Sequence, residues 1–498
     1  MPTPRTLSAA RRLACLLWLL ALLALPLSCG EALAAESDTF IRSVVLIKEG
    51  VRAPSESEIR LQRLDKAHTW TDWPVGAGRV TRRGKDLVRA LWSAVGQALR
   101  DDGLFPQEGC PKPGLIYMRV DAMPRSLDTA SAVLEGVLPG CHEGYWARPE
   151  GLADPLFHAL RAGYCPLRPQ ETASDIIQSL PDKSLDALTD SLSGELDVLD
   201  SLLAPLNKNL CERYSLPNCR VSEMATNVTV MPRGAGAFLS GGLGMAAGLA
   251  DIFLMEAYQG SFSVAGAKTG DKNLLAKLWS LRTAARNPVN RSQVVSSASA
   301  SGMLKAMVDA LFGRLPDKRA RDARFVIFVG HDLCMGQTAG LAGLHWSIPG
   351  IAAQNPTLPG CGLTFELWRR PDGSQYVVSH LLANEPETLH TLELHGDDGT
   401  LKPVRVMALD VRGEDGLPFN MDDKTFETTM LSRIRGECVP PEPEDLRYCY
   451  PAPESEGVKG AAAGKEHRSP RPPELVPDTI PDTIPDMPSD TSPDTPED

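Results

Sequence analysis

Apolar residues gather in short unbroken runs along the first and last thirds of the chain. The runs at residues 44–47 and 325–329 predict buried strands, because strands buried on both faces lack the polar alternation of half-exposed ones, and residues 115–120 are also strand-like. Residues 87–99 repeat apolar side chains with the period of an amphipathic helix. Alternating strands and helices of this kind predict an α/β domain.

Two more runs predict a β-hairpin. Residues 363–368 and 376–382 have strand patterns, and Pro371-Asp372-Gly373 lies between them. Proline and glycine suit the dihedral angles of a tight turn, so this tripeptide is expected to join two antiparallel strands.

From about residue 151 to residue 300 the pattern is mostly helical. Apolar residues recur at three- and four-residue spacing in residues 186–203, and residues 241–259 are rich in Ala, Gly, Leu and Met. A chain of 498 residues is too long for one simple core. We therefore expect one α/β domain made of residues 38–150 and 301–440, with residues 151–300 inserted as a helical lobe.

The two ends of the chain differ in composition from the rest. Three arginines precede an apolar run at residues 13–27, and residues 32–34 offer a small-x-small cleavage site, which predicts a signal peptide at residues 1–34. The run is short for a membrane span and no later stretch is longer, so we expect a periplasmic or secreted protein without a membrane span. Residues 452–498 hold ten Pro and eleven Asp or Glu against four Lys or Arg, which predicts a disordered acidic tail of unknown partner.

Charge and cysteine content exclude some function classes. The net charge is −12 and no basic stripe occurs, which argues against nucleic-acid binding. Nine cysteines follow the predicted signal, an odd number that leaves at least one thiol free if disulfides form in an oxidising compartment. No Cys-x-x-Cys occurs, so a zinc ribbon is unsupported, and we expect no metal and no cofactor.

Residues that could bind a ligand or act in catalysis follow two of the predicted buried strands. Lys48-Glu49-Gly50-Val51-Arg52-Ala53-Pro54 comes after the first, and Gly330-His331-Asp332 comes between residues 325–329 and a helical stretch. Such junctions expose side chains at the carboxyl edge of a sheet and offer free backbone N–H groups to an anion. Arg125, near a predicted helix start, adds a planar guanidinium that suits phosphate. Each feature alone has a plainer explanation, such as a helix-capping Asp or a solvated Arg.

Together these motifs resemble the histidine acid phosphatases, in particular the bacterial periplasmic phytase and glucose-1-phosphatase types. The first loop resembles their Arg-His-Gly-x-Arg-x-Pro motif, with Lys48 for the first Arg and Glu49 for the nucleophilic His. Gly330-His331-Asp332 resembles the His-Asp motif, and Arg125-Ser126 resembles the start of an Arg-Thr-x-x-Thr pattern. Segments at residues 70–84, 346–350 and 359–363 extend the resemblance from about residue 43 to residue 438.

The resemblance implies a mixed sheet flanked by helices and a pocket for a phosphate monoester or another small anion, with phosphomonoester hydrolysis as the reaction. Asp332 would donate a proton to the leaving group, and Lys48, Arg52, Arg125 and His331 would bind the phosphoryl group. The resemblance also implies the disulfides Cys110–Cys141, Cys165–Cys438 and Cys211–Cys219. Cys334 and Cys361 flank segments expected to be adjacent and are candidates for an extra bridge, which would leave Cys449 free.

Glu49 leaves the mechanism open, because a carboxylate about 4 Å from a phosphoryl charge is repelled by roughly 4 kcal/mol. It could pair with the arginines so that turnover through a phosphohistidine is lost, or it could itself attack phosphorus or activate water. A different histidine could also act. The candidates are His68, His142, His158, His345, His380, His390 and His395. We favour the first alternative, because two adjacent motif positions differ together.

Three function classes follow from these alternatives. The chain is expected to be a phosphatase-like protein of the phytase and sugar-phosphatase kind, with hydrolysis impaired by Glu49. The alternatives are an inactive relative that binds a phosphorylated or other anionic ligand, and an envelope protein that interacts through its lobe or tail.

Overall fold

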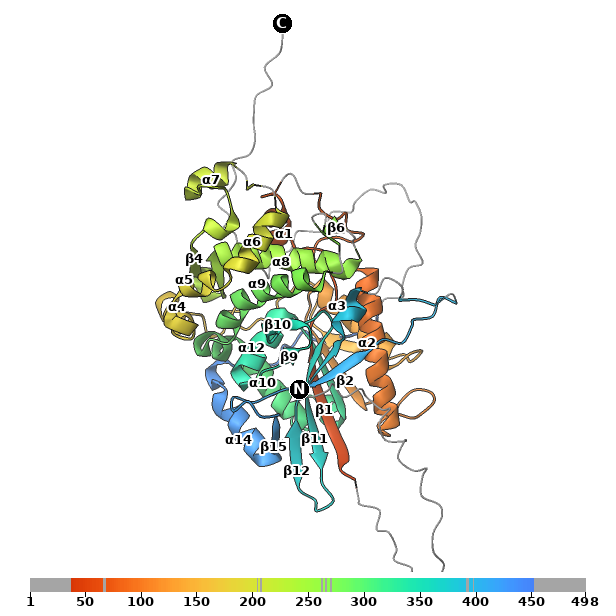
Figure 1. Ribbon diagram of the computed structural model, residues 1–498. Coiled ribbons are helices and arrows are strands. Elements are labelled where there is room, and N and C mark those ends of the chain that lie inside the picture. The colour runs from red at the N-terminus through yellow and green to blue at the C-terminus, as the bar shows by residue number, and fades with distance from the viewer. Residues whose placement is uncertain are drawn as a thin grey trace, which may run out of the picture.

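A mixed β-sheet runs through the centre of the protein (Figure 1). Its strand order is β14-β13-β11-β1-β8-β2-β3-β16, with β12 and β15 attached beside β11. The central strands β1 (Thr39–Ile47), β8 (Phe325–Val329) and β2 (Ile116–Val120) are parallel, and β11 (Gly362–Arg369) is antiparallel to β1. The other strands of this sheet are β3 (Tyr145–Ala147), β12 (Gln375–Val378), β13 (His380–Asn384), β14 (Val406–Asp410), β15 (Asn420–Asp422) and β16 (Arg447–Cys449).

The structure is a computed structural model that describes residues 37–451, apart from residues 66–68, 204, 207, 261–262, 265–266, 269–270, 391–393 and 397. The predicted signal peptide and the predicted acidic tail therefore lie outside the described residues. Within the described part of the chain, no helix combines the length and the apolar character that crossing a membrane requires.

Helices cover both faces of the central strands, which explains why these strands are continuously apolar. Side chains alternate between faces along β1. Val45 and Ile47 belong to the apolar cluster that contains α2 (Arg82–Asp101) and α3 (Pro124–Val137), whereas Val44 and Leu46 belong to the cluster of α10 (Gln293–Leu311) and α12 (Asp332–Ala342). The expected α/β class with a mixed sheet flanked by helices is confirmed.

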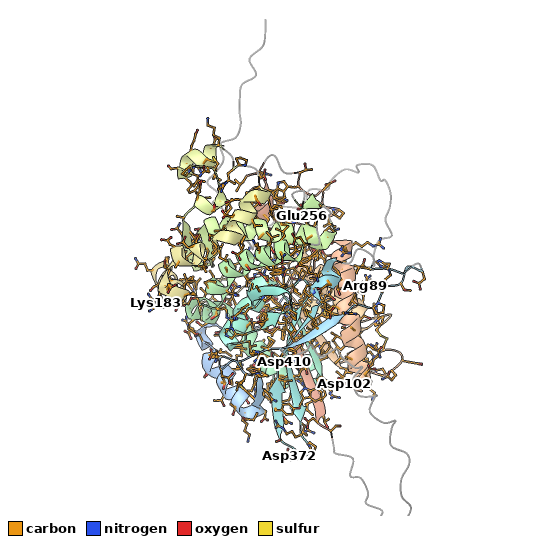
Figure 2. All side chains as sticks on the ribbon, viewed as in Figure 1. Arg89, Asp102, Lys183, Glu256, Asp372 and Asp410 are labelled. Carbon is orange, nitrogen blue, oxygen red and sulfur yellow. A yellow bond between two sulfur atoms is a disulfide. The ribbon has the colours of Figure 1, made fainter. Side chains whose placement is uncertain are left out.

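The predicted hairpin forms, with its turn at Pro371-Asp372-Gly373 and Asp372 at its exposed tip (Figure 2). The second predicted strand is divided at Ser379 into β12 and β13. The division has a physical cause, because β12 pairs with β15 on its outer side whereas β13 pairs with β14. Ser379 joins the two parts to β11 by donating its hydroxyl to the carbonyl of Thr364.

Between the two parts of the sheet the chain is largely helical, and these helices gather in the upper part of Figure 1. The apolar repeat at residues 186–203 covers two helices, α5 and α6, and the Ala/Gly/Leu-rich stretch is α8. The helices of this region are α4 (Pro169–Gln178), α5 (Leu185–Asp190), α6 (Ser193–Leu202), α7 (Lys208–Tyr214), α8 (Gly242–Gln259) and α9 (Lys272–Asn290). Two hairpins accompany them, β4 (Thr226–Val230) with β5 (Ala237–Gly241), and β6 (Ser263–Val264) with β7 (Ala267–Lys268).

Shorter elements complete the fold. They are α1 (Glu56–Gln62), α11 (Lys318–Asp322), β9 (Ser347–Ile348), β10 (Ile351–Gln354), α13 (Pro386–His390), α14 (Asp423–Arg433) and the 3₁₀ turns η1 (Pro181–Lys183), η2 (Val221–Glu223), η3 (Pro232–Gly234) and η4 (Gly436–Cys438). Of these, α1 matters for function because it follows directly on the loop at residues 48–54.

The described part of the chain contains three disulfides, and they are the three that the resemblance implies: Cys110–Cys141, Cys165–Cys438 and Cys211–Cys219. The expected extra bridge between Cys334 and Cys361 is wrong, because both are free thiols, as is Cys449. Cys361 directs its sulfur at Met335 of α12, with 3.6 Å between the two sulfur atoms. Burial raises the pKa of Cys361 to about 12, so this thiol stays protonated and unreactive.

Candidate functional site

The site forms where β1 and β8 end side by side. Their parallel register pairs Ile47 with Val329, so the loop at residues 48–54 and the segment Gly330-His331-Asp332 leave the sheet at the same edge. The N–H of Gly330 donates to the carbonyl of Ile47 at 2.9 Å and fixes this junction. Parallel strands flanked by helices bind ligands at this edge, because the carboxyl ends of the strands and the helix N-termini meet there.

Glu49 is buried and points at the start of α12. Its Oε2 accepts a hydrogen bond from the backbone N–H of Asp332 at 3.1 Å, and its Oε1 lies 3.7 Å from Nε of Arg52. Free N–H groups and the helix dipole make a helix N-terminus favourable for an anion. The side chain at the expected nucleophile position therefore places the protein's own negative charge where an external anion would bind.

Arg52 is held by acidic side chains on both sides. Its two terminal nitrogens form a bidentate pair with Glu58 of α1 at 2.7 and 3.0 Å, and Nη2 lies 3.4 Å from Oδ2 of Asp251 in α8. Burial opposes the charge of Arg52, but Glu58, Asp251 and Glu49 outweigh burial and raise its pKa above the ordinary arginine value. Glu58 is itself fixed, because it accepts the N–H of Ser55 in the capping box that begins α1.

Asp332, the expected proton donor, is surrounded by cations. Arg282 and Arg286 of α9 approach its Oδ2 at 2.9 and 3.1 Å, and Nζ of Lys48 lies 3.7 Å from its Oδ1, which also accepts the hydroxyl of Thr357. Burial alone would raise the pKa of Asp332, but these three cations hold it well below its usual range. Asp332 is therefore ionised and, in this arrangement, carries no proton to donate.

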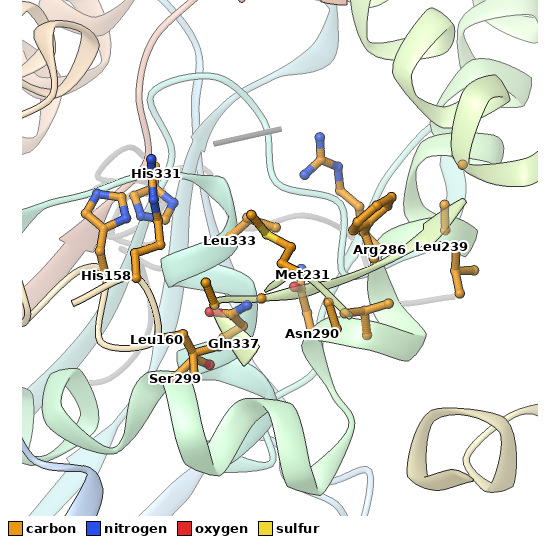
Figure 3. A pocket seen from close by; sticks show the side chains of 18 of the residues that line it. His158, Leu160, Met231, Leu239, Arg286, Asn290, Ser299, His331, Leu333 and Gln337 are labelled. Atoms are coloured by element: carbon orange, nitrogen blue, oxygen red, sulfur yellow. The ribbon is translucent and has the colours of Figure 1, made fainter. Parts of the chain in front are cut away.

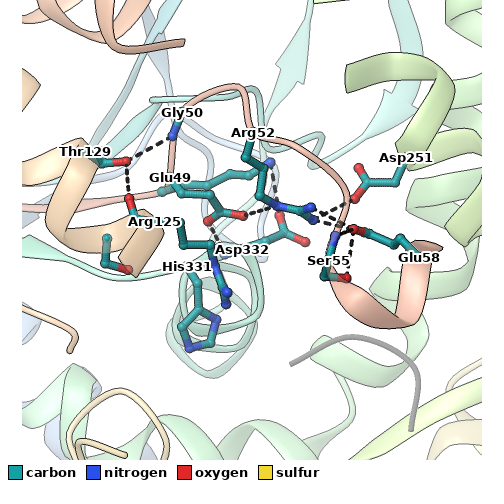
Figure 4. A network of polar contacts seen from close by, with 12 residues as sticks. Glu49, Gly50, Arg52, Ser55, Glu58, Arg125, Thr129, Asp251, His331 and Asp332 are labelled. Atoms are coloured by element: carbon teal, nitrogen blue, oxygen red, sulfur yellow. Dashed lines mark hydrogen bonds and ion pairs between the residues drawn. The ribbon is translucent and has the colours of Figure 1, made fainter. Parts of the chain in front are cut away.

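The polar groups form one network in which charges of opposite sign alternate (Figure 4). Asp251 links its two halves, because it bonds Nε of Arg282 at 2.6 Å and also faces Arg52. The network has equal numbers of acidic and cationic side chains, namely Glu49, Glu58, Asp251 and Asp332 with Lys48, Arg52, Arg282 and Arg286.

Arg125 reaches the same pocket from α3. Pro124 occupies the first helical position and Arg125 the second, which is where a preset proline dihedral starts a helix well. The helix is tied to both segments of the site, because the N–H of Gly50 donates to Thr129 and the hydroxyl of Ser126 donates to the carbonyl of Gly330. Arg125 lines the pocket beside Glu49 and His331.

His331 caps α12, so the alternative of a capping Asp332 is wrong. Nδ1 of His331 accepts the N–H of Cys334 at 3.3 Å, and Nε2 lies 3.3 Å from the carbonyl of Phe157, which assigns the proton to Nε2. Its ring stacks on His158 with 4.5 Å between centroids, and Nε2 of His158 lies 2.9 Å from Oδ2 of Asp121. No sequence motif surrounds His158, because only the fold brings its loop beside His331.

Ligand atoms of Asp121, His158 and His331 lie within 4.8 Å of one another, and these residue types bind transition metals. The two rings are nearly parallel, with 16° between their planes. Parallel stacked rings direct their nitrogen lone pairs along separate planes rather than at one point. The arrangement therefore suits a stacked pair oriented by Asp121 better than a shared ion.

Several residues of the network were not anticipated from the sequence: Glu58, Asp251, Arg282, Arg286 and Thr357. One signal was available, because the largely apolar α8 carries two acidic residues, Asp251 and Glu256, which are only 2% and 1% exposed. A charged residue in an apolar helix requires a buried partner. Arg282 and Arg286 lie four residues apart on α9 and share one helix face, but their acceptors are distant in the sequence.

The buried carboxylates make stability depend on pH. Asp332 has a pKa far below the usual range, and burial of Asp251 is outweighed by Arg282, Arg286 and Arg52, which lower its pKa as well. In acid the unfolded chain then binds more protons than the folded one. The contribution of these two carboxylates to the free energy of unfolding is therefore complete above about pH 4 and is lost as the pH falls towards their pKa values in the folded state. We expect the urea concentration at the midpoint of unfolding to decrease when the pH is lowered below 4. In Asp332→Asn this midpoint should decrease less steeply with pH than in the native chain. Equal slopes would contradict the assignment.

Comparisons with known proteins agree with this geometry. No protein-family model matches the chain. Phytase AppA of Escherichia coli (strain K12) is 30% identical over 378 residues, which cover 72% of this chain and 84% of that protein. A glucose-1-phosphatase of Providencia rettgeri is 25% identical over 294 residues, covering 58% and 67%. The structure of a Hafnia alvei phytase in complex with myo-inositol hexakis sulphate superimposes with a TM-score of 0.70 at 25% identity, over 82% of this chain and all of that one.

Proposed function

Because this chain belongs to the histidine acid phosphatase family, we propose that it binds a small anionic ligand, such as a phosphate monoester, at the junction of β1 and β8. We propose further that hydrolysis through a phosphohistidine is lost. The observation that carries the proposal is Glu49, which takes the nucleophile position and bonds the N-terminus of α12.

Loss of the nucleophile is the first part of the argument. A phosphohistidine needs an imidazole in line with phosphorus, and position 49 offers a carboxylate instead. Both oxygens of Glu49 are engaged, one with the N–H of Asp332 and the other with Arg52. A carboxylate held in this way is a poor attacking group, so the geometry favours a structural Glu49 over one that attacks phosphorus or activates water.

Loss of the acid is the second part. A leaving alkoxide needs a proton, and efficient donors have a pKa near the working pH. Lys48, Arg282 and Arg286 stabilise the ionised form of Asp332 and so hold its pKa below that range. Turnover would be slowed at this step even if another group attacked phosphorus.

The capacity to bind an anion is the third part. Arg125 and His331 line the pocket, and Arg286 also lines it with a side chain that is 20% exposed. Guanidinium groups pair well with phosphate. The relatives support a phosphorylated ligand, since they are named phytase and glucose-1-phosphatase.

We also propose a periplasmic or secreted location, which the three disulfides support, and an inserted helical lobe at residues 151–300 that shapes the ligand site.

A second candidate function is hydrolysis by a different histidine. His158 is the specific candidate, because Asp121 orients its ring and His331 stacks on it beside the pocket. An imidazole oriented by a carboxylate is a common arrangement for an activated base or nucleophile. This alternative predicts activity that is lost in His158→Gln and is retained in Glu49→Gln.

The test uses the purified protein with p-nitrophenyl phosphate and phytate between pH 4 and pH 7. We expect no turnover above background, and we expect inorganic phosphate to raise the melting temperature because a ligand that binds only the folded state stabilises it. Arg125→Gln should weaken this stabilisation, whereas Arg369→Gln, which changes an exposed arginine at the end of β11, should not. Turnover that disappears in Glu49→Gln would overturn the proposal, and so would the absence of any effect of phosphate.

A further inference from the structure

A second and larger space adjoins the charged pocket (Figure 3). Its cavity volume is about 140 Å³, against about 20 Å³ for the charged pocket, so it is the larger of the two. Arg286, His331 and Leu333 line both spaces and mark where they meet. A ligand whose charged group lies in the small pocket would therefore extend into the larger one, which we call the apolar chamber.

Small residues on one helix face leave room for the chamber. Ala247 and Gly248 are adjacent on α8 and line this space with little side-chain volume, and Gly244 before them packs so closely on the carbonyl of Leu239 that no side chain would fit there. Met231, Phe238 and Leu239 line it from the β4–β5 hairpin. Leu160 and Val289 add further apolar surface from the loop after β3 and from α9.

Cationic groups are few in this lining. Among the described residues that line the chamber, Arg161 and Arg286 are the arginines, and no lysine occurs. A ligand with several phosphate groups requires several cations or other donors, since each buried charge must be paired. The chamber supplies apolar contacts instead, and Figure 3 shows Arg286 on one side of it and the stacked rings of His158 and His331 on the other.

We propose that the site takes an amphiphilic phosphate monoester, with one anionic head at Arg286 and His331 and an apolar body in the chamber. This inference rests on the proposed function, because it assumes that the head group is an anion bound at the junction of β1 and β8. The apolar body provides affinity that the neutralised network does not, since burying each methylene group is worth roughly fourfold in affinity.

The experiment compares four probes by calorimetry at pH 5.5, where a phosphate monoester is mostly monoanionic because its second pKa is about 6. The probes are octyl phosphate below its micellar concentration, glycerol 3-phosphate, inositol hexakisphosphate and octanol. We expect octyl phosphate to bind at least roughly tenfold more tightly than each of the others. Phe238→Gln should reduce the affinity for octyl phosphate roughly tenfold and leave that for glycerol 3-phosphate unchanged. Leu417→Gln, which changes a leucine that is 62% exposed elsewhere, should alter neither.

The outcomes separate the two proposals. If glycerol 3-phosphate or inositol hexakisphosphate binds as tightly as octyl phosphate, the apolar chamber does not select the ligand, and this inference is overturned while the proposed function stands. If octanol binds as tightly as octyl phosphate and Arg286→Gln changes neither affinity, no anion site exists and both proposals fail. Binding of octyl phosphate that Phe238→Gln leaves intact would also overturn the inference, because the body would then lie elsewhere.

Discussion

Replacing Lys48 by Arg and Glu49 by His together should give measurable hydrolysis of p-nitrophenyl phosphate, whereas the native chain is expected to show none. The double variant supplies an imidazole at the position from which Glu49 now reaches the N–H of Asp332, and it supplies a guanidinium beside it. It also removes one negative charge from the space for the phosphoryl group. We expect rates at least roughly 10²-fold above the native chain, the lower end of what one well-placed catalytic group contributes.

The gain should be limited by the rest of the network. Arg52 stays paired with Glu58 and Asp251 in the double variant, so its guanidinium is not released to phosphate. Adding Glu58→Gln should raise the rate further, because glutamine can keep the capping box of α1 while the ion pair with Arg52 is lost.

The matched control is Lys48→Arg with Glu49→Gln, which removes the charge of Glu49 without supplying an imidazole. This control should remain inactive and should bind inorganic phosphate more tightly than the native chain. Equal activity of the control and the histidine variant would show that charge alone blocks turnover, and it would contradict the role assigned to the missing nucleophile.

Replacing Arg282 by Met should destabilise the protein by about 3–5 kcal/mol, the usual cost of removing one partner from a buried ion pair. Arg282 is 3% exposed and pairs with Asp251 at 2.6 Å and with Asp332 at 2.9 Å. Its guanidinium also lies over the ring of Trp279, 5.0 Å from the centroid. Removal leaves two buried carboxylates with fewer partners. The measurement is the free energy of unfolding from urea titrations at pH 7.

The same helix provides the control. Lys272 at the start of α9 pairs with Glu387 at 2.7 Å, but the two side chains are 75% and 60% exposed. Exposed ion pairs contribute about 0–1 kcal/mol, so Lys272→Met should change stability by no more than that. If Arg282→Met lowers the free energy of unfolding as little as Lys272→Met does, the buried network contributes little to stability.

The order of apolar runs and junction motifs was sufficient to predict the α/β sheet and the candidate loop. Continuous runs such as residues 325–329 specify strands covered on both faces, and the parallel pairing of β1 with β8 then brings the segments after them to one edge. Local pattern was also sufficient for α2, α8 and the β11–β12 hairpin, because helix period and turn chemistry act over a few residues. The implied disulfides followed from resemblance rather than from pattern.

Charge pairing within the site could not be predicted in this way. The partners of Arg52 and Asp332 come from α1, α8, α9 and the loop after β1, with 199 residues between Arg52 and Asp251, and nothing in a local pattern specifies which buried charges meet. The free thiols of Cys334 and Cys361 illustrate the same limit, since adjacent segments do not determine the direction of a side chain. The sequence already revealed that Lys48 and Glu49 replace the Arg and His of the loop motif. Only the tertiary structure decided that the cations of this loop are paired with the protein's own carboxylates. The physical reason is that electrostatic pairing depends on distance in space, whereas sequence patterns report only neighbours along the chain.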